Sequence, residues 1–440
     1  MDACFLRHNE LPDLTIERLG SPEIISPLEK VNYHFVEDNE KILIYSRLED
    51  MEPDRRPDAK LPAFEIAGPR RKIFFDPHKL NCGIVTCGGL CPGINDVIRA
   101  ISLGLLWQYG IKNVFGFRYG YSGLSSRPYK EPLLITPEIV DEIHHRGGSI
   151  LASSRGPQDS GEMVDTLHKM NISILFTIGG DGTLKGAADI VKEIKRRKLQ
   201  ISVIGVPKTI DNDICGIERT FGYSTAVEAA RPAILAAHEE AKGAWNGIGL
   251  VKLMGRDSGF IAAHAVLANS DANFCFIPEV PLVLEGEDGF LNRLEKRLEN
   301  KHHAVIIVAE GAGQNLMGDN PGIASKDASG NTKLMDAGVF LKKIINEYFE
   351  KKNKQVAVKY IDPSYTIRSL TANSEDSSFC LILGQNAVHA GMSGRTNMVV
   401  GYWNQHFTHI PISLAVHERK RIKTDSLLWQ TVLVTTGQTK

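Results

Sequence analysis

The chain has 440 residues, of which 42% are hydrophobic and 23% are charged, and its formal net charge is -1. This composition is typical of a globular protein, and the length predicts two or three domains. The near-neutral charge disfavours a nucleic-acid binder that depends on a broadly basic surface. No uninterrupted apolar run reaches the ~20 residues of a membrane-spanning helix. From the charge we expect no nucleic acid as a partner, and from the lack of such a run we expect no membrane.

Cysteine usage and local charge give further expectations. The seven cysteines are too few for a disulfide scaffold, and their odd number leaves at least one thiol outside any intrachain bridge. The N-terminal stretch contains acidic residues and lacks the apolar core of a signal peptide. We therefore expect a reduced, cytoplasmic protein. The basic runs at 70–72, 195–198 and 417–423 are interpreted as solvated faces.

The predicted elements change in character along the chain. Residues 1–76 form an N-terminal extension rich in Pro, Glu, Asp and Arg, within which 49–62 is predicted to be an extended linker. From residue 82, short β-branched runs alternate with amphipathic stretches. The predicted strands are 82–87, 113–117, 172–178, 201–206, 248–254 and 304–309, and the predicted helices include 94–108 and 184–198. The strands do not alternate cleanly in polarity, which is typical of parallel strands buried on both faces.

This alternation predicts an α/β fold of two Rossmann-like three-layer domains with mainly parallel sheets, in addition to the N-terminal extension. The expected boundaries are 77–214 for the first domain, completed by later segments, 215–415 for the second, interleaved domain, and 416–440 for a C-terminal segment. Ligands of such sheets bind beyond the carboxyl ends of the strands. The loops that follow the strands are therefore the candidate sites.

Glycines dominate the loop at 86–96. Gly88, Gly89 and Gly93 precede a predicted helix opened by Pro92 or Asn95. Bare backbone amides and the helix dipole favour an anion there, although an ordinary strand-to-helix turn has the same composition. The spacing of the cysteines in this region, at 82, 87 and 91, fits no zinc site.

The stretch TIGGDGTLKGA at 177–187 adds a carboxylate to a similar loop. Asp181 follows Gly179 and Gly180 and precedes Gly182. A carboxylate beside bare amides suits Mg²⁺ bound to nucleotide phosphates, because this ion combines few protein carboxylates with phosphate oxygens. A turn with an Asx cap is the alternative.

Two later loops carry further chemical groups. Asp211 and Asp213 in VPKTIDNDICG can have different roles: one carboxylate takes a proton, while the other orients the first or holds a metal. Turns also favour such residues without any catalytic role. Arg256 in KLMGRDSGF can stabilise a transferring phosphoryl group or form a surface ion pair. Tyr365 and Arg368 share a face if their turn is helical.

Together, GGLCPGIN, GGDGT, PKTIDND, MGRDSG and YTIR resemble the 6-phosphofructokinase family over residues ~80 to ~415. The N-terminal extension and the forms TCGGLCPG and VKLMGRDSGF are similar to its long-chain ATP-dependent subfamily. The resemblance implies phosphorylation of fructose 6-phosphate at its 1-hydroxyl with ATP. It makes 77–214 the nucleotide-binding domain and 215–415 the fructose 6-phosphate-binding domain.

The resemblance also implies residue roles. Asp211 would be the general base, Asp213 would support the base and the metal, and Asp181 would bind Mg²⁺. The catalytic set would be Thr209, Asp211, Asp213 and Arg256. The ATP-binding set would be Gly88, Gly89, Arg155, Gly156, Gly180, Asp181, Gly182 and Thr183. The set that binds fructose 6-phosphate would be Thr209, Ile210, Asp211, Met254, Gly255, Arg256, Glu310, Lys359, Tyr365, Thr366, Ile367 and Arg368. A homotetramer is also implied.

Two positions concern donor choice and one departs from the family pattern. Pyrophosphate-dependent relatives carry Asp at the position of Gly182 and Lys at that of Lys208, and a carboxylate at 182 would crowd and repel the α-phosphate of ATP. The pair of Gly182 and Lys208 resembles the ATP-dependent long-chain subfamily. Gly247 stands where compact members carry an arginine that binds the sugar phosphate of a neighbouring subunit. The alternatives are a pyrophosphate-dependent enzyme, a NAD or lipid kinase, and a non-catalytic paralogue.

Overall fold

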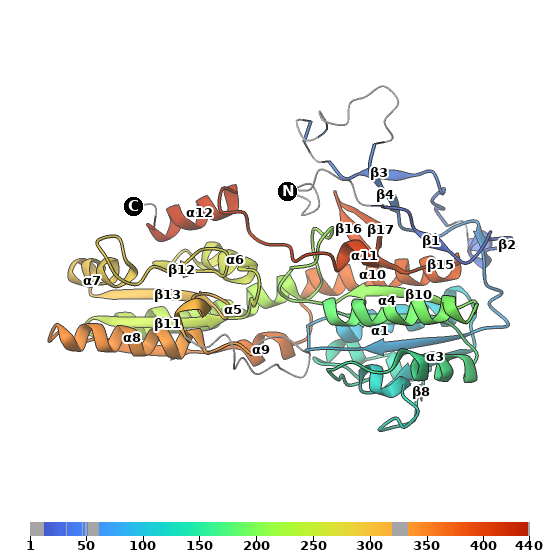
Figure 1. Ribbon diagram of the computed structural model, residues 1–440, viewed down its shortest axis with the longest axis horizontal. Coiled ribbons are helices and arrows are strands. Elements are labelled where there is room, and N and C mark those ends of the chain that lie inside the picture. The colour runs from blue at the N-terminus through green and yellow to red at the C-terminus, as the bar shows by residue number, and fades with distance from the viewer. Residues whose placement is uncertain are drawn as a thin grey trace. The chain divides into compact units, whose positions relative to one another are not determined.

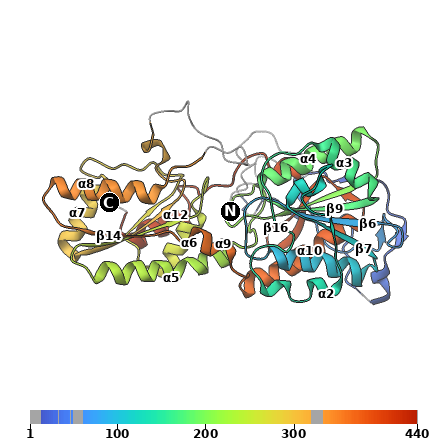
Figure 2. The same cartoon turned by 90° about the horizontal axis from the view of Figure 1, so that it is seen from below.

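The computed structural model describes residues 13–31, 33–45, 47–48, 51, 61–318 and 333–438. The chain divides into two compact units, each of which is shown in Figures 1 and 2. Unit 1 comprises the described residues up to Thr209, with Ile214–Gly222 and Ser369–Arg419. Unit 2 comprises Ile210–Asp213, Tyr223–Arg368 and the described residues from Lys420 onward. The predicted linker at 49–62 lies almost entirely outside the described residues.

Unit 1 is built on a sheet with nine strands in the described part of the chain, in the order β3-β4-β17-β16-β10-β9-β6-β7-β8. Strands β16, β10, β9, β6 and β7 are parallel, whereas β3, β4, β17 and β8 pair antiparallel at the two edges. The strands are β3 (Lys41–Leu43), β4 (Ala63–Ile66), β6 (Asn81–Thr86), β7 (Asn113–Phe117), β8 (Leu133–Leu134), β9 (Ile172–Gly179), β10 (Ser202–Pro207), β16 (Met398–Trp403) and β17 (His406–Pro411).

Helices cover both faces of this sheet, as Figure 2 shows. Helices α3 (Ser160–Lys169) and α4 (Asp181–Arg196) pack together on one face, and α1 (Ile94–Leu103) packs with α10 (Ser374–Met392) on the other. The shorter elements are α2 (Pro137–Val140), α11 (Ile412–Ala415), the 3₁₀ helices η2 (Pro27–Val31), η5 (Gly120–Leu124) and η6 (Ile143–His145), and the antiparallel pairs β1 (Glu17–Arg18) with β15 (Arg395–Thr396) and β2 (Ile24–Ile25) with β5 (Lys72–Ile73). Unit 1 therefore has the expected three layers.

Unit 2 has a parallel sheet, four-stranded within the described residues, in the order β12-β13-β11-β14. The strands are β11 (Gly247–Leu253), β12 (Phe274–Phe276), β13 (His303–Ala309) and β14 (Ala357–Ile361). Helices α7 and α8 lie on one face and α5 and α6 on the other (Figure 2). The helices are α5 (Tyr223–Lys242), α6 (Phe260–Asn269), α7 (Phe290–Lys301), α8 (Ala337–Lys351), α9 (Ser364–Ser369), α12 (Leu427–Thr436) and the 3₁₀ helix η7 (Gln314–Leu316).

The predicted elements agree with the structure within a few residues at each end, with two differences that matter. Helix α4 begins at Asp181 rather than at 184, so the acidic side chain belongs to its first turn. The predicted helix at 94–108 is α1 followed by a π-helical segment, η4 (Gly104–Gln108), and its N-cap is Gly93 rather than Pro92 or Asn95. At Gly93 (φ +95°) an added Cβ would lie 2.6 Å from Cys380 Sγ, so both conformation and packing require glycine.

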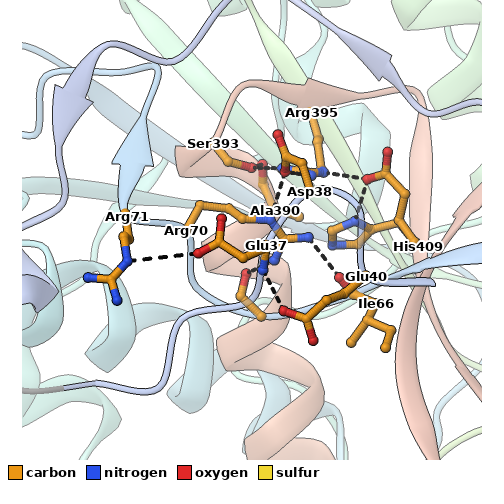
Figure 3. A network of polar contacts seen from close by, with 12 residues as sticks. Glu37, Asp38, Glu40, Ile66, Arg70, Arg71, Ala390, Ser393, Arg395 and His409 are labelled. Carbon is orange, nitrogen blue, oxygen red and sulfur yellow. Dashed lines mark hydrogen bonds and ion pairs between the residues drawn. The ribbon is translucent and has the colours of Figure 1, made fainter. Parts of the chain in front are cut away.

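A network of charged side chains joins the N-terminal extension to the sheet of unit 1 (Figure 3). Arg395 is 1% exposed, and it contacts Asp38 at 2.8 Å and Glu65 at 2.9 Å. Arg70 adds a second contact to Asp38 at 2.9 Å, and His409 Nδ1 lies 3.4 Å from Glu65. The interpretation of 70–72 as a solvated face is therefore wrong for Arg70, which is 6% exposed.

Two other expectations can be compared with the described residues. Their free cysteines are Cys82, Cys87, Cys91, Cys275 and Cys380, all buried. None of the described helices combines the length and the apolar character that crossing a membrane requires.

Candidate functional site

The glycine loop after β6 lies against Lys208, which follows β10. Gly88 has a left-handed backbone (φ +86°), and its N–H donates to the carbonyl of Ser154 at 3.0 Å. The Lys208 ammonium donates to the carbonyl of Gly89 at 2.6 Å, and Lys208 is only 5% exposed. Residues 155–156 follow Ser154 directly and are therefore held beside this loop. The structure thus brings Gly88 and Gly89 together with Lys208, the lysine linked to donor choice, and with the segment that leads into Arg155 and Gly156.

The second glycine loop starts α4. Gly180 is its N-cap, with extended backbone, and Asp181 is its first residue. The Lys208 N–H donates to the carbonyl of Gly179 at 3.0 Å, so one lysine residue joins the two glycine loops. Free amides at a helix N-terminus favour an anion. Backbone amides and Lys208 of unit 1 thus lie together at a candidate site for an anion.

Gly179 and Gly182 in this loop differ in whether packing requires a glycine. A Cβ on Gly179 would lie 2.1 Å from Thr183 Oγ1, so this glycine makes room for a neighbouring side chain rather than for a ligand. Thr183 is 6% exposed, and its carbonyl accepts the Tyr121 hydroxyl at 2.7 Å. A Cβ on Gly182 would meet no heavy atom of the described residues within 4 Å. The bare backbone at 182 is therefore not required by packing within the chain.

The Asp181 carboxylate lies between two cations. Lys185 Nζ is 3.0 Å away, one helical turn further along α4, and Arg419 Nη2 is 3.4 Å away. The spacing of Asp181 and Lys185 is visible in the sequence, whereas Arg419 is recognised only from the structure. Arg419, in the basic run at 417–423, is partly exposed and pairs with this carboxylate.

Both aspartates of the loop at 206–216 belong to unit 2, and they are tied to the arginine loop. Ser258, which is fully buried, donates its hydroxyl to the carbonyl of Asp211 at 3.1 Å. Asp213 is 4% exposed, and its carbonyl accepts the Lys420 N–H at 2.9 Å. Asn212 between them has a left-handed backbone (φ +54°). These bonds fix the backbone around Asp211 relative to the loop that carries Arg256.

The two residues that precede Asp211 are also held by the fold. Thr209 belongs to unit 1, where its carbonyl accepts the Thr220 hydroxyl at 2.7 Å. Ile210 is 5% exposed, so little of this residue is open to a ligand.

Arg256 and Glu310 follow adjacent strands of unit 2. Gly255 has a positive φ of +128°, and the Gly311 N–H donates to its carbonyl at 3.1 Å. A Cβ on Gly311 would lie 1.9 Å from the carbonyl oxygen of Arg256, so the two loops can approach only because 311 is glycine. The Glu310 N–H in turn donates to the carbonyl of Leu253 at 2.9 Å.

Electrostatics place Glu310 among cations. Burial raises the pKa of the Glu310 carboxyl. Three neighbouring positive charges oppose that shift, those of Arg256, Lys252 and Arg368. The group combines a carboxylate that can accept a hydroxyl hydrogen bond with arginines that can bind a phosphate.

Helix α9 carries the YTIR residues. The guanidinium carbon of Arg368 lies 4.7 Å from the ring centroid of Tyr365, so the predicted shared face is confirmed. Tyr365 is 75% exposed, whereas Ile367 is fully buried and presents its side chain to the core. Thr366 lies between them in the same helix.

Two other predicted positions lie away from this cluster. Lys359 in β14 pairs with Glu240 of α5 at 3.6 Å. Gly247 begins β11, at the opposite end of that strand from Arg256. A Cβ on Gly247 would lie 2.0 Å from the carbonyl oxygen of Ala241, so this backbone excludes an arginine at 247. The departure from the compact family pattern therefore has a packing reason.

Comparisons with known proteins agree with these motifs. The family model described as phosphofructokinase matches residues 81–391. The chain is 48% identical to the ATP-dependent 6-phosphofructokinase of Borreliella burgdorferi, over 98% of each chain. It is 44% identical to the protein of that name from Amycolatopsis methanolica, over 97% of this chain and 95% of the relative. In fold, it is similar to the crystal structure of the pyrophosphate-dependent phosphofructokinase from Marinobacter aquaeolei, with TM-score 0.65, 18% identity, and 82% and 91% of the two chains covered.

Proposed function

Because this chain belongs to the phosphofructokinase family, we propose that it transfers the terminal phosphoryl group of ATP to the 1-hydroxyl of fructose 6-phosphate. The products are fructose 1,6-bisphosphate and ADP. The observation that carries this proposal is the similarity, over nearly the full length of the chain, to relatives named ATP-dependent 6-phosphofructokinase. Those names also disfavour the pyrophosphate-dependent alternative.

The proposed chemistry assigns roles to groups in each unit. In unit 1, the amides of the two glycine loops and Lys208 bind the phosphates of ATP. In unit 2, Arg256 and Arg368 bind the phosphate of fructose 6-phosphate, and Glu310 accepts a hydrogen bond from one of its hydroxyls. Asp211 accepts the proton of the 1-hydroxyl while the new phosphorus–oxygen bond forms and the bond to ADP breaks. Positioning and charge neutralisation supply most of the remaining rate enhancement.

We also propose Mg²⁺ as the cofactor, with Asp181 as its carboxylate ligand. The Asp181 side chain is 18% exposed at the start of α4, and Mg²⁺ bound there would replace Lys185 and Arg419 as its partners. When bound, the ion neutralises charge on the phosphates.

We further propose that the protein is a homotetramer and that it is located in the cytoplasm. Light scattering after gel filtration should then give four times the mass of one chain.

The first test is replacement of the proposed base. We expect Asp211→Ser to lower kcat by ~10²- to 10⁴-fold, because the sugar hydroxyl loses its proton acceptor. A coupled assay that offers ATP and pyrophosphate separately measures this and the donor choice together. The control is Asp189→Ser, which removes an exposed carboxylate paired with Lys192 on α4. A variant at 211 that keeps a near wild-type kcat would contradict the mechanism.

A further inference from the structure

A buried lysine at the end of β11 joins three elements of unit 2. Lys252 is 8% exposed, and its Nζ lies 2.7 Å from Asp336 Oδ2 and 2.7 Å from Asp362 Oδ2. Burial alone would lower the pKa of this lysine, but the hydrogen bonds to the two carboxylates outweigh it and raise the pKa. The lysine is therefore charged and held from two sides.

Each of the two carboxylates also organises the start of a helix. Asp336 is the N-cap of α8: its Oδ1 accepts the Val339 N–H at 2.9 Å and the Tyr360 hydroxyl at 2.9 Å. Asp362 Oδ1 accepts the N–H of Ser364 at 3.1 Å and also its hydroxyl, where α9 begins. Through these two aspartates, Lys252 ties β11 to the N-termini of α8 and α9.

This arrangement lies next to the proposed sugar-phosphate groups. β11 leads into the loop of Arg256, and α9 carries Arg368. The charges of Lys252 and both arginines act on Glu310. Since Lys252 pairs with both aspartates, the two carboxylates are compensated within this cluster.

We propose that Lys252, Asp336 and Asp362 form a clamp that positions Arg368 and Tyr365 for fructose 6-phosphate; this rests on the proposed function. Lys252 is a positioning residue that does not itself contact the substrate. The clamp fixes the start of α9 against β11, the strand that leads into the Arg256 loop. It thereby sets the distance between Arg256 and Arg368, on which a phosphate bound by both arginines depends.

The experiment compares kinetic constants for the two substrates. We expect Lys252→Met to raise KM for fructose 6-phosphate about tenfold, with kcat and KM for ATP changed by less than threefold. Lys252→Arg should raise KM for fructose 6-phosphate much less than Lys252→Met does, because it keeps the charge between the aspartates. Asp362→Asn keeps an acceptor for Ser364 but removes the charge, and it should raise the same KM. The control is Lys343→Met, an exposed lysine of α8 paired with Glu347.

A double variant and folding measurements separate positioning from stability. Lys252→Met with Asp362→Asn should raise KM by less than the product of the single effects, because both remove one clamp. Urea unfolding shows whether Lys252→Met is folded, and Asp362→Asn carries the test if it is not. An unchanged KM for fructose 6-phosphate, or a parallel loss in both substrates, would overturn the clamp. A wild-type protein inactive on fructose 6-phosphate would refute the proposed function itself, and the clamp with it.

Discussion

At the residue scale, Gly182 is the position at which an added side chain has the clearest expected effect. A Cβ there meets no atom of the described residues, and an acidic residue in the first turn of a helix is compatible with the helix dipole. We therefore expect Gly182→Asp to fold normally and to lower kcat/KM for ATP at least tenfold, because the carboxylate crowds and repels the α-phosphate. The measurement is the steady-state rate with ATP and with pyrophosphate.

Gly182→Ala is the matched control for this prediction. It adds the Cβ without the charge, so its ATP kinetics should remain close to those of the wild type. Unchanged ATP kinetics in Gly182→Asp would show that the steric and electrostatic argument is wrong.

Motif residues could be predicted from the sequence, but the reasons for some of them could not. The order of glycines and carboxylates identifies Asp181 and Gly182. That Gly179 is required by the Thr183 side chain appears only when a helix turn brings the two together. The contact of Arg419 with Asp181 joins residues far apart in the sequence, and no local pattern encodes it.

At the element scale, Glu295 connects α7 to the end of α8. Its carboxylate accepts the Tyr348 hydroxyl at 2.8 Å and contacts Lys352 at 2.5 Å and Lys354 at 2.7 Å. Burial favours the neutral acid, but the hydrogen bonds from the two lysines and the tyrosine outweigh it and lower the pKa of Glu295 to about 2. The carboxylate is ionised in the folded state well below the pH at which it protonates in the unfolded chain.

The sign of the pH dependence follows from this lowered pKa. The stabilisation is complete above the unfolded pKa of about 4.5 and is lost as the pH falls towards 2. We expect Glu295→Gln to cost about 1 to 2 kcal/mol at pH 7, since the lysines are partly exposed and screened, and to cost less at pH 3. Urea unfolding at both pH values measures this. Glu347→Gln, in an exposed pair with Lys343, is the control, and an equal cost at both pH values would contradict the prediction.

Elements were predicted best where their signal is local. Strands β6, β9, β10, β11 and β13 are apolar on both faces, and runs such as ISILFTI identify them. The antiparallel strands β3, β4 and β17 were not predicted. They lie at the antiparallel end of the sheet, where β3 is the edge strand, and β4 pairs with strands that are distant in the sequence.

At the scale of the whole molecule, the charged network of unit 1 determines how the N-terminal extension is held. We expect Arg395→Met to destabilise the protein by about 3 kcal/mol, because it leaves the buried Glu65 carboxylate with fewer partners. It should also speed proteolysis of the extension, as measured by limited digestion. Arg71→Met, which removes a 61% exposed guanidinium near Glu37, is the control. Unchanged stability and digestion in Arg395→Met would contradict this role.

The β4 strand in this extension has a wider consequence for the molecule. It covers β17, which would otherwise be an open sheet edge in the described part of unit 1. Open edges invite strands of other chains, and charged or covering segments prevent this. A chain lacking residues 1–76 would expose β17 and leave Arg395 and His409 without the Glu65 carboxylate. We therefore expect a chain without residues 1–76 to self-associate through β17, which gel filtration would detect as an increase in apparent mass.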